Sequence, residues 1–344
     1  MKNFISNLFI ALFIVCMVSS CGGGRNSGEE NKESPKTACI PALSQCNSVY
    51  HWKTVFDLTE EECDFLHTHN VARIYLRMFD IEAEQNLVSG ELDVNPIATT
   101  KFISEIPKDV EIVPVTYITL DALKAMRGSE RKYAYMIAKR LMAISSYNNC
   151  GKIKEIQLDC DWTKLTEKSY FTLCSCVKEL LHKDSIALST TIRLHQIKAN
   201  SAVPPVDRGV LMLYNTGNIK SIETKNSILD IDNVKPYLNN KNYGLPLSYA
   251  YPAFGWGVMF KGDKFVSIVS DPSKSADMAT SVAKAATDST SVREERASVQ
   301  EILAVKKLVE NILGKPEGGN IIYHLDYEQL KNYSNNEISE IYSY

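Results

Sequence analysis

From Val49 to the end of the chain, short runs of β-branched and aromatic residues alternate with segments whose apolar residues recur at helical spacing. This alternation favours a parallel sheet whose strands are joined by crossover helices. Eight such units predict a (β/α)8 barrel, the TIM-barrel class, over residues 46–344. The predicted strands are Val49–Lys53, Ala72–Phe79, Val110–Ile118, a strand within Ile153–Thr163, Ile186–Ile192, Val210–Tyr214, Leu245–Tyr251 and Ile321–Leu325.

Helical patterns lie between these runs. Thr59 followed by three glutamates resembles a capping box and predicts a short helix through His67. A helix over about Ser129–Ile144 has an apolar stripe on one face, and a second stripe runs from Tyr170 to Leu181. After the sixth strand, Pro236 and the asparagines around it predict a short or broken helix.

The longest connection, Pro252–Gly319, separates the seventh and eighth strands and predicts an insertion in the barrel. Lys261-Gly262-Asp263 lies between two apolar runs and indicates a β-hairpin. Residues 271–300 are rich in Ser, Thr, Ala and charge and predict a surface excursion or a partly disordered segment. An amphipathic helix follows over Val299–Leu313 and ends at Gly314.

Charge and motif content exclude several classes of protein. The net charge is −3, and the basic residues are interspersed with acids, so no basic face for nucleic acid is expected. No phosphate-binding glycine loop or GxSxG elbow is present, and no Cys and His spacing suits zinc. We therefore expect neither a metal nor a cofactor. Nothing in the sequence indicates an oligomeric state.

The N-terminus resembles a bacterial lipoprotein signal. Lys2 precedes an uncharged apolar run, Phe4–Val18, which is short for a membrane span, and Ser19-Ser20-Cys21 follows. The resemblance implies a signal peptide over 1–20, lipid on Cys21, and a protein anchored to a membrane of the bacterial cell envelope. The alternative is an uncleaved anchor helix. Residues 21–45 are expected to be a flexible tether before the barrel.

Seven cysteines remain after Cys16 and Cys21, so at least one thiol is unpaired. Cys39 and Cys46 are close enough in sequence to form a disulfide in an oxidising envelope. Cys160, Cys174 and Cys176 lie in apolar patterns and are expected to be buried as small hydrophobic side chains.

The chemistry of the predicted barrel is expected at the carboxyl ends of its strands. There, Asp159 and Asp161 lie two residues apart, so a strand would direct both carboxylates to one side. We take them as the catalytic candidates. Other acidic, amide and aromatic strand-end residues are candidates for substrate binding: Trp52, Asp80, Tyr117, Tyr214, Asn215, Tyr249, Tyr251 and Asp326. Aromatic rings stack on sugars and carboxylates bind hydroxyls or move protons, so a glycan is the expected partner.

Each candidate also has a structural explanation. Asp159 could be a hydrogen-bonded acid inside the barrel mouth. Arg193 and His195 could be polar residues at a strand end whose hydrogen bonds are satisfied within the protein. Tyr249, Tyr251 and Trp256 could be packing residues.

Leu158-Asp159-Cys160-Asp161-Trp162 resembles the strand-four signature of family-18 glycoside hydrolases, the chitinase-like barrels. Met212-Leu213-Tyr214-Asn215 is similar to their strand-six segment, whose tyrosine and acid support the acetamido group of the substrate. The whole chain looks nearer to secreted bacterial barrels related to these hydrolases. The resemblance implies the barrel fold and a glycan substrate.

Three positions depart from that pattern. Thr163 stands where the family has its proton-donating glutamate, Ile156 replaces the first aspartate, and Asn215 replaces an acid. Because a threonine hydroxyl cannot protonate a glycosidic oxygen, the family mechanism cannot be transferred intact. Acid-assisted hydrolysis centred on Asp159 and Asp161, glycan binding without cleavage, and a scaffold role in an envelope complex all remain open.

Overall fold

The computed structural model shows eight parallel strands that close into a barrel, because β1 pairs with both β14 and β3. It describes residues 40, 44–86, 90, 92–198, 201–239, 243–269 and 290–344. The predicted (β/α)8 barrel is therefore confirmed. Its strands are β1 (Asn47–His51), β3 (Val71–Gln85), β6 (Glu111–Ile118), β7 (Glu155–Asp159), β8 (Ala187–Ile192), β9 (Arg208–Met212), β10 (Leu247–Pro252) and β14 (Asn320–Tyr323).

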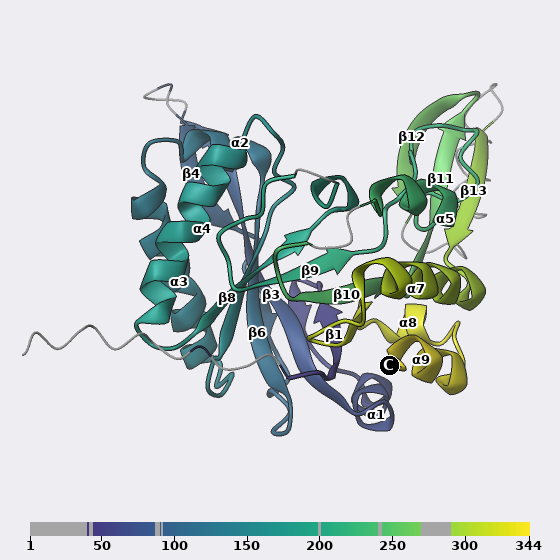
Figure 1. Ribbon diagram of the computed structural model, residues 1–344, viewed down its shortest axis with the longest axis horizontal. Helices are drawn as coiled ribbons and strands as arrows, with labels where there is room; N and C mark the ends of the chain where they lie inside the picture. Colours follow the sequence, from purple (N-terminus) through teal and green to yellow (C-terminus); the bar gives the residue numbers. More distant parts are fainter. Residues whose placement is uncertain are drawn as a thin grey trace, which may run out of the picture. The chain divides into compact units, whose positions relative to one another are not determined.

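Helices surround the barrel, and α3 and α4 lie side by side on one side of it (Figure 1). The apolar stripes predicted for these two helices are buried. The helical elements are α1 (Glu60–Thr68), α2 (Leu120–Ala125), α3 (Glu130–Tyr147), α4 (Glu167–His182), η1 (Leu194–Gln196), α5 (Ile231–Val234), η2 (Lys235–Tyr237), α7 (Val299–Leu313), α8 (Tyr327–Leu330) and α9 (Asn335–Tyr342).

Local sequence signals account for several helix boundaries. The predicted capping box is present: Thr59 Oγ1 accepts from Glu62 N, and the Glu62 carboxylate accepts from Thr59 N. Ser298 and Glu301 make the same exchange at the start of α7. The helix expected to be short after the sixth strand consists of α5 and η2, with Pro236 in the first turn of η2.

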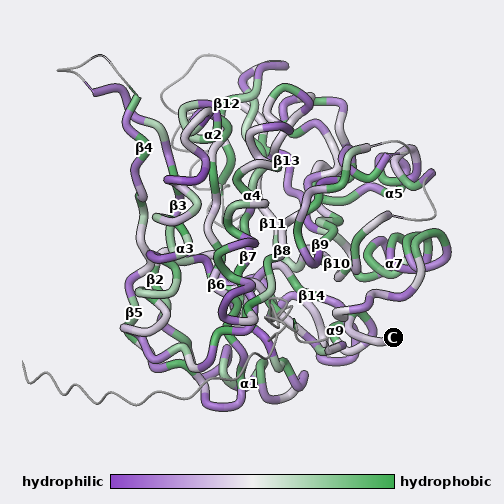
Figure 2. Tube along the Cα trace, turned by 60° about the vertical axis from the view of Figure 1, so that its left-hand side comes forward, coloured by the Kyte–Doolittle hydropathy of each residue, from purple (hydrophilic) through white to green (hydrophobic). Residues whose placement is uncertain are grey.

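Between β10 and β14 the chain forms a separate three-stranded antiparallel sheet and then α7. The hairpin of β11 (Gly255–Lys261) and β12 (Lys264–Val269) turns at Gly262, which has a φ of 56°. On its other edge β11 pairs with β13 (Thr290–Arg296). α7 carries both hydrophobic and hydrophilic residues along its length (Figure 2). Residues 270–289 of the predicted surface excursion lie outside the described residues.

β3 is longer than predicted because it continues beyond Asp80 and forms an antiparallel ladder with β4 (Leu92–Ile97). The residues after Ile81 are mostly half-buried or exposed, so they lack the continuous apolar pattern of a barrel strand. A further short parallel pair joins β2 (Val55–Phe56) to β5 (Lys101–Phe102).

The barrel interior contains polar residues that bond across it. Tyr50 Oη donates to Gln157 Oε1 at 2.7 Å, and Gln157 Nε2 donates to Ser189 Oγ at 3.3 Å. Since side chains alternate along a strand, Asp159 shares this inward face of β7 with Gln157 and Glu155. Glu155 in turn accepts from Arg208 Nη1 at 2.6 Å.

The buried thiols agree with the sequence prediction, because Cys160, Cys174 and Cys176 are 0%, 0% and 8% exposed. The suggested Cys39–Cys46 pairing involves Cys39, which lies outside the described residues, as do the signal sequence and Cys21. Among the described helices, none is long and apolar enough to cross a membrane.

Candidate functional site

Asp159 is the last residue of β7 and is only 2% exposed. Its Oδ1 accepts a hydrogen bond of 2.5 Å from Thr191 Oγ1 on β8. Burial raises the pKa of Asp159 to about 6; Arg193 and the Thr191 bond act against this rise, and Asp161 and Asp80 add to it. Asp159 is therefore a buried carboxyl that changes charge close to neutral pH.

Asp161 lies just beyond the strand and is half-buried. Its Oδ1 accepts from Arg193 Nε, which follows β8, and the two groups form an ion pair. Desolvation opposes charge on Arg193, but Asp159 and Asp161 outweigh it and raise the pKa of this guanidinium. Arg193 thus acts on both aspartates and forms an ion pair with Asp161, the less buried of the two.

Asp80 on β3 is held in the same manner by Arg77. Arg77 Nε and Nη2 donate to the two carboxylate oxygens of Asp80 at 2.8 and 2.6 Å, and Arg77 Nη1 donates to Ala98 O at 3.1 Å. A two-bond fork of this kind fixes a carboxylate in position. Because Asp80 contributes to the raised pKa of Asp159, it belongs to the same end of the barrel.

Tyr117 on β6 lies opposite Asp159 in the strand register and is half-buried. Burial, with the nearby Asp161 and Asp159, raises its pKa to about 12. The phenol therefore stays protonated at neutral pH and can donate a hydrogen bond.

Aromatic side chains from the ends of four barrel strands, β1, β9, β10 and β14, meet at the same mouth. The Tyr214 and Tyr323 rings stack with centroids 4.7 Å apart, and Trp52 lies 6.0 Å from Tyr323. Phe254 packs edge-on against both tyrosines, and Trp256 packs against Phe254. Trp52, Tyr323 and Trp256 are half-buried, so they leave ring surface open to a ligand.

A cavity of about 370 Å³ opens at the ends of β8 and β9. It brings together Asp161, Tyr214 and Asn215, as the sequence predicted, with Arg193 and His195 beside them. Asn215 is exposed and has a φ of 56°, a conformation that asparagine tolerates better than most residues. The hydroxyl of Tyr214 is buried and has no hydrogen-bond partner in the structure.

Two predicted binding residues lie elsewhere. Tyr249 and Tyr251 are 1% and 0% exposed, and Tyr249 Oη donates to Gly314 O, beyond α7, at 2.9 Å. They point away from the mouth because their positions alternate with those that face the barrel interior. Asp326, which follows β14, does not line the cavity. It pairs with Lys53 at 3.3 Å, and Lys53 also contacts Glu62 of α1 at 2.8 Å.

Thr163, at the position of the family glutamate, is exposed and belongs to the turn before α4. Its backbone N donates to Thr166 Oγ1 at 2.9 Å, and its hydroxyl lies 3.5 Å from the same atom. The residue thus shapes the start of the helix and supplies no acid.

The sequence did not point to Thr191 or Tyr237, which respectively bond Asp159 and line the cavity. Tyr323 is one of the strand-end aromatic residues visible in the sequence, and it joins the aromatic cluster. The end position of Tyr323 on the eighth strand was the available signal. Tyr237 belongs to η2, in the short helical segment after β9, and no sequence pattern indicated that this segment would reach the cavity. Within the part of the chain that the structure describes, no group of three His, Cys, Asp or Glu residues is placed to hold a metal ion.

The fold is a (β/α)8 barrel with acidic and aromatic side chains at the carboxyl ends of its strands. The chain is similar in structure to the spore cortex-lytic enzyme SleL of Bacillus cereus, with a TM-score of 0.51 and 15% identity over 88% of this chain and 75% of that chain. It is also similar to a chitinase from Chromobacterium violaceum, with a TM-score of 0.51 and 12% identity over 84% of this chain and 98% of that chain.

A third similar structure is the GH18 chitinase ChiB from the chitin utilization locus of Flavobacterium johnsoniae, with a TM-score of 0.51 and 12% identity over 87% of this chain and 94% of that chain. No protein-family model and no curated protein matches the sequence. At these identities the likeness establishes the fold, and it confirms the resemblance to chitinase-like barrels at that level.

Proposed function

We propose that this protein binds a glycan in its barrel mouth without cleaving it. The observation that carries the proposal is the ion pair between Asp161 and Arg193. A carboxylate oxygen that accepts a hydrogen bond from a guanidinium is already engaged, so it is poorly placed to act on a glycosidic bond. Asp80 is occupied in the same way by Arg77, and Thr163 offers no replacement for the missing glutamate.

The same features suit recognition of a sugar. The half-buried faces of Trp52 and Tyr323 offer apolar surface of the kind that stacks on a pyranose ring. Around the cavity, Asn215 and His195 supply donors and acceptors for hydroxyl groups, and Tyr214 also lines it. Both arginines at the mouth are already paired with aspartates, so we expect the ligand to be an uncharged oligosaccharide.

The similar structures suggest the first ligands to test. Two of them are chitinases, so chitin oligosaccharides belong in a glycan panel beside other neutral oligosaccharides. Affinity electrophoresis in gels that contain each glycan would measure retention, and mass spectrometry would detect any released sugar. We expect retention by at least one glycan with no released product. Absence of retention on every glycan would contradict the proposal and favour the scaffold role.

Matched variants separate the mouth from the rest of the surface. Trp52→Ala removes a ring at the mouth and should weaken retention about tenfold. Tyr147→Ala removes an aromatic ring that is 88% exposed at the last residue of α3, before β7 begins, and should leave retention unchanged. Equal effects of the two variants would exclude the mouth as the binding site.

Hydrolysis is the second candidate, and one observation favours it: the pKa of Asp159, about 6, suits a group that exchanges protons near neutrality. In that case wild-type protein would release sugar with a pH profile that has an inflection near 6. Asp159→Asn would abolish the release. If wild type and variant bind a glycan equally well and neither releases a product, hydrolysis is excluded.

We also propose that the chain is a lipoprotein of the bacterial cell envelope, attached to the membrane by lipid on Cys21. The support is the uncharged apolar run that ends at Ser19-Ser20-Cys21. Full-length protein expressed in a bacterium should partition into the detergent phase, and Cys21→Ala should partition into the aqueous phase. Equal partitioning of the two proteins would refute lipid attachment at Cys21.

A further inference from the structure

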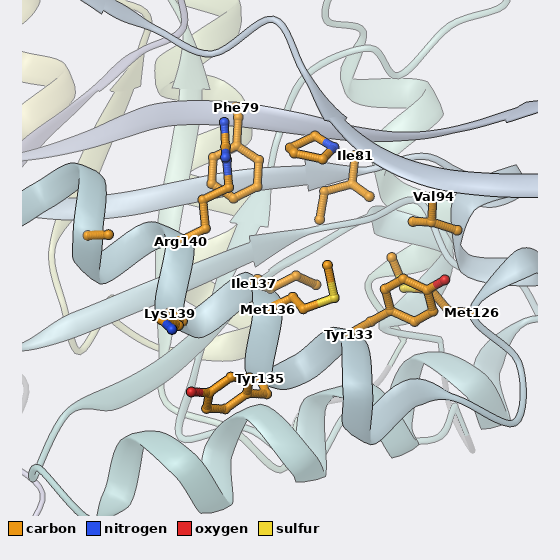
Figure 3. Close-up of a pocket in the computed structure, with 12 residues that line it drawn as sticks. Phe79, Ile81, Val94, Met126, Tyr133, Tyr135, Met136, Ile137, Lys139 and Arg140 are labelled. Atoms are coloured by element: carbon orange, nitrogen blue, oxygen red, sulfur yellow. The ribbon is translucent and has the colours of Figure 1, made fainter. Parts of the chain in front are cut away.

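A second cavity, of about 450 Å³, lies on the outside of the barrel between the β3 and β4 hairpin and helix α3. It shares no lining residue with the cavity at the mouth. Phe79 and Ile81 of β3 and Val94 of β4 line its sheet side (Figure 3). Met136 and Ile137 of α3 line the helix side. The volume and the apolar lining are those of a site for a small molecule.

The fold explains why this surface is open. β3 continues past the barrel to Gln85, so its outward face extends beyond the strands on either side. The short helix α2 ends at Ala125, and Met126 lines the cavity just after it. Met136 is 47% exposed and Tyr135 is 55% exposed, which is unusual for large side chains beside a sheet. These side chains leave an apolar pocket open to solvent.

Two cations lie at the rim. The Arg140 guanidinium sits over the Phe79 ring at 5.1 Å, and Lys139 Nζ sits over the Tyr135 ring at 5.7 Å. In Figure 3 both emerge from α3 on the side of the pocket away from Val94 and Met126. The pocket therefore has a charged end and an apolar end.

Arg140 retains capacity to bind an anion. Its Nη2 donates to Thr99 Oγ1 at 3.0 Å, whereas its buried Nε has no hydrogen-bond partner. Among the described residues, no carboxylate forms an ion pair with Arg140 or Lys139. A guanidinium that contacts only a ring and a hydroxyl still has N–H donors available, and it can bind a carboxylate through them.

We propose that this pocket, on the β3, β4 and α3 surface, binds a fatty acid, with its chain between Phe79, Val94 and Met136 and its carboxylate at Arg140 and Lys139. Charge complementarity selects this occupant over a neutral lipid or a sugar. The apolar end offers few hydrogen-bond partners for hydroxyls. At the other end, the two cations complement a negative charge. The site is independent of glycan binding at the barrel mouth.

Isothermal titration calorimetry with dodecanoate, below its micellar concentration, tests the proposal on the folded protein. We expect one site per chain, and affinity that rises with acyl length by up to roughly fourfold per methylene. Dodecanol should bind more weakly than dodecanoate, and dodecyltrimethylammonium more weakly still. Equal affinity for the anionic and cationic amphiphiles, or no saturable binding, would overturn the proposal. These measurements need only the wild-type protein.

Substitutions then locate the site. Arg140→Gln should weaken dodecanoate binding about tenfold and leave dodecanol binding unchanged. Met136→Trp, at an exposed position of the rim, should fill the pocket and weaken both ligands. Lys168→Met on α4 removes an exposed positive charge outside the pocket and is the matched control.

Two results would overturn the assignment. One is an equal loss of dodecanoate affinity in Arg140→Gln and Lys168→Met, which would mean non-specific attraction by surface charge. The other is a concentration-dependent dimer that Met136→Trp abolishes, which would assign the pocket to contact between two copies of the chain.

Discussion

The Arg193 guanidinium donates from Nε to the Asp161 carboxylate, which joins the residues that follow β8 and β7. Arg193 also lowers the pKa of the buried Asp159, against the larger effect of burial. One arginine thus pairs with Asp161 and acts electrostatically on Asp159, the two aspartates that the sequence singles out. It also sets the mouth apart from one in which free carboxylates flank a scissile bond.

Arg193→Gln should raise the pKa of Asp159 above its value of about 6, because the variant removes the cation that favours the charged form. Carboxyl ¹³C chemical shifts followed through a pH titration would measure the change. Arg131→Gln breaks a pair on the exposed surface, Arg131 with Glu179, and serves as the control. An unchanged midpoint in Arg193→Gln would contradict the assigned electrostatic coupling.

Asp159→Asn should change how stability depends on pH. The folded pKa of Asp159 is raised from 3.8 to about 6, so the native state holds this proton more tightly than the unfolded chain does. Wild type therefore loses up to about 3 kcal/mol of this stabilisation as the pH rises from below 4 to above 6. The variant lacks that loss.

Urea unfolding of Asp159→Asn and wild type at several pH values between 4 and 8 measures the difference. The free energy of unfolding of the variant, relative to wild type, should increase across this interval. A constant difference would mean that Asp159 titrates in the native protein as it does in the unfolded chain.

Tyr214→Phe should leave stability almost unchanged, because the hydroxyl it removes is buried and makes no hydrogen bond. Tyr342 is also buried, but its hydroxyl donates to Ser48 O at 2.9 Å. Tyr342→Phe should therefore lower the free energy of unfolding by about 1–2 kcal/mol. Denaturant unfolding compares them. If Tyr214 Oη is reserved for a ligand, Tyr214→Phe alone should also weaken glycan retention.

Glu295 on β13 ties the inserted sheet to the loop after β9. Its carboxylate accepts from Ser227 N at 3.0 Å, from Trp256 Nε1 at 2.9 Å and from Arg293 Nε at 2.6 Å. Because Glu295 is 3% exposed, Glu295→Ala leaves Arg293 without its carboxylate and should cost about 3–5 kcal/mol. The Trp256 ring would also lose its hydrogen bond.

Limited proteolysis of Glu295→Ala should cut the loop of residues 216–230 sooner than in wild type. Glu295→Gln keeps one acceptor oxygen and should lie between the two. Identical cleavage rates in all three proteins would show that Arg293, which also donates to Ser221 O at 2.7 Å, holds the loop without Glu295.

The barrel could be predicted because each strand carries its own signal: a short β-branched run such as Ala187–Ile192 reads as a buried strand by itself. The prediction that Asp159 and Asp161 lie on one side of the strand end followed from strand alternation in the same way. Tyr249 and Tyr251 show the limit, because they share one face of β10 but the sequence does not say which face the barrel encloses.

The pairing of Arg193 with Asp161 could not be predicted, since the contact depends on how two loops leave adjacent strands. The pocket beside Phe79 was missed for a similar reason. The strand β4 that completes it, Leu92–Ile97, has mostly exposed residues and no run that marks it as a strand.

The central claim is that the mouth binds a glycan and leaves it intact. The most direct test incubates the oligosaccharide that wild-type protein retains with a molar excess of that protein in H₂¹⁸O, and then weighs the recovered sugar by mass spectrometry. The account predicts full recovery of the intact oligosaccharide, with no ¹⁸O at a new reducing end, from pH 5 to pH 8. Shortened products that carry ¹⁸O would contradict it and make Asp159 the first residue to replace.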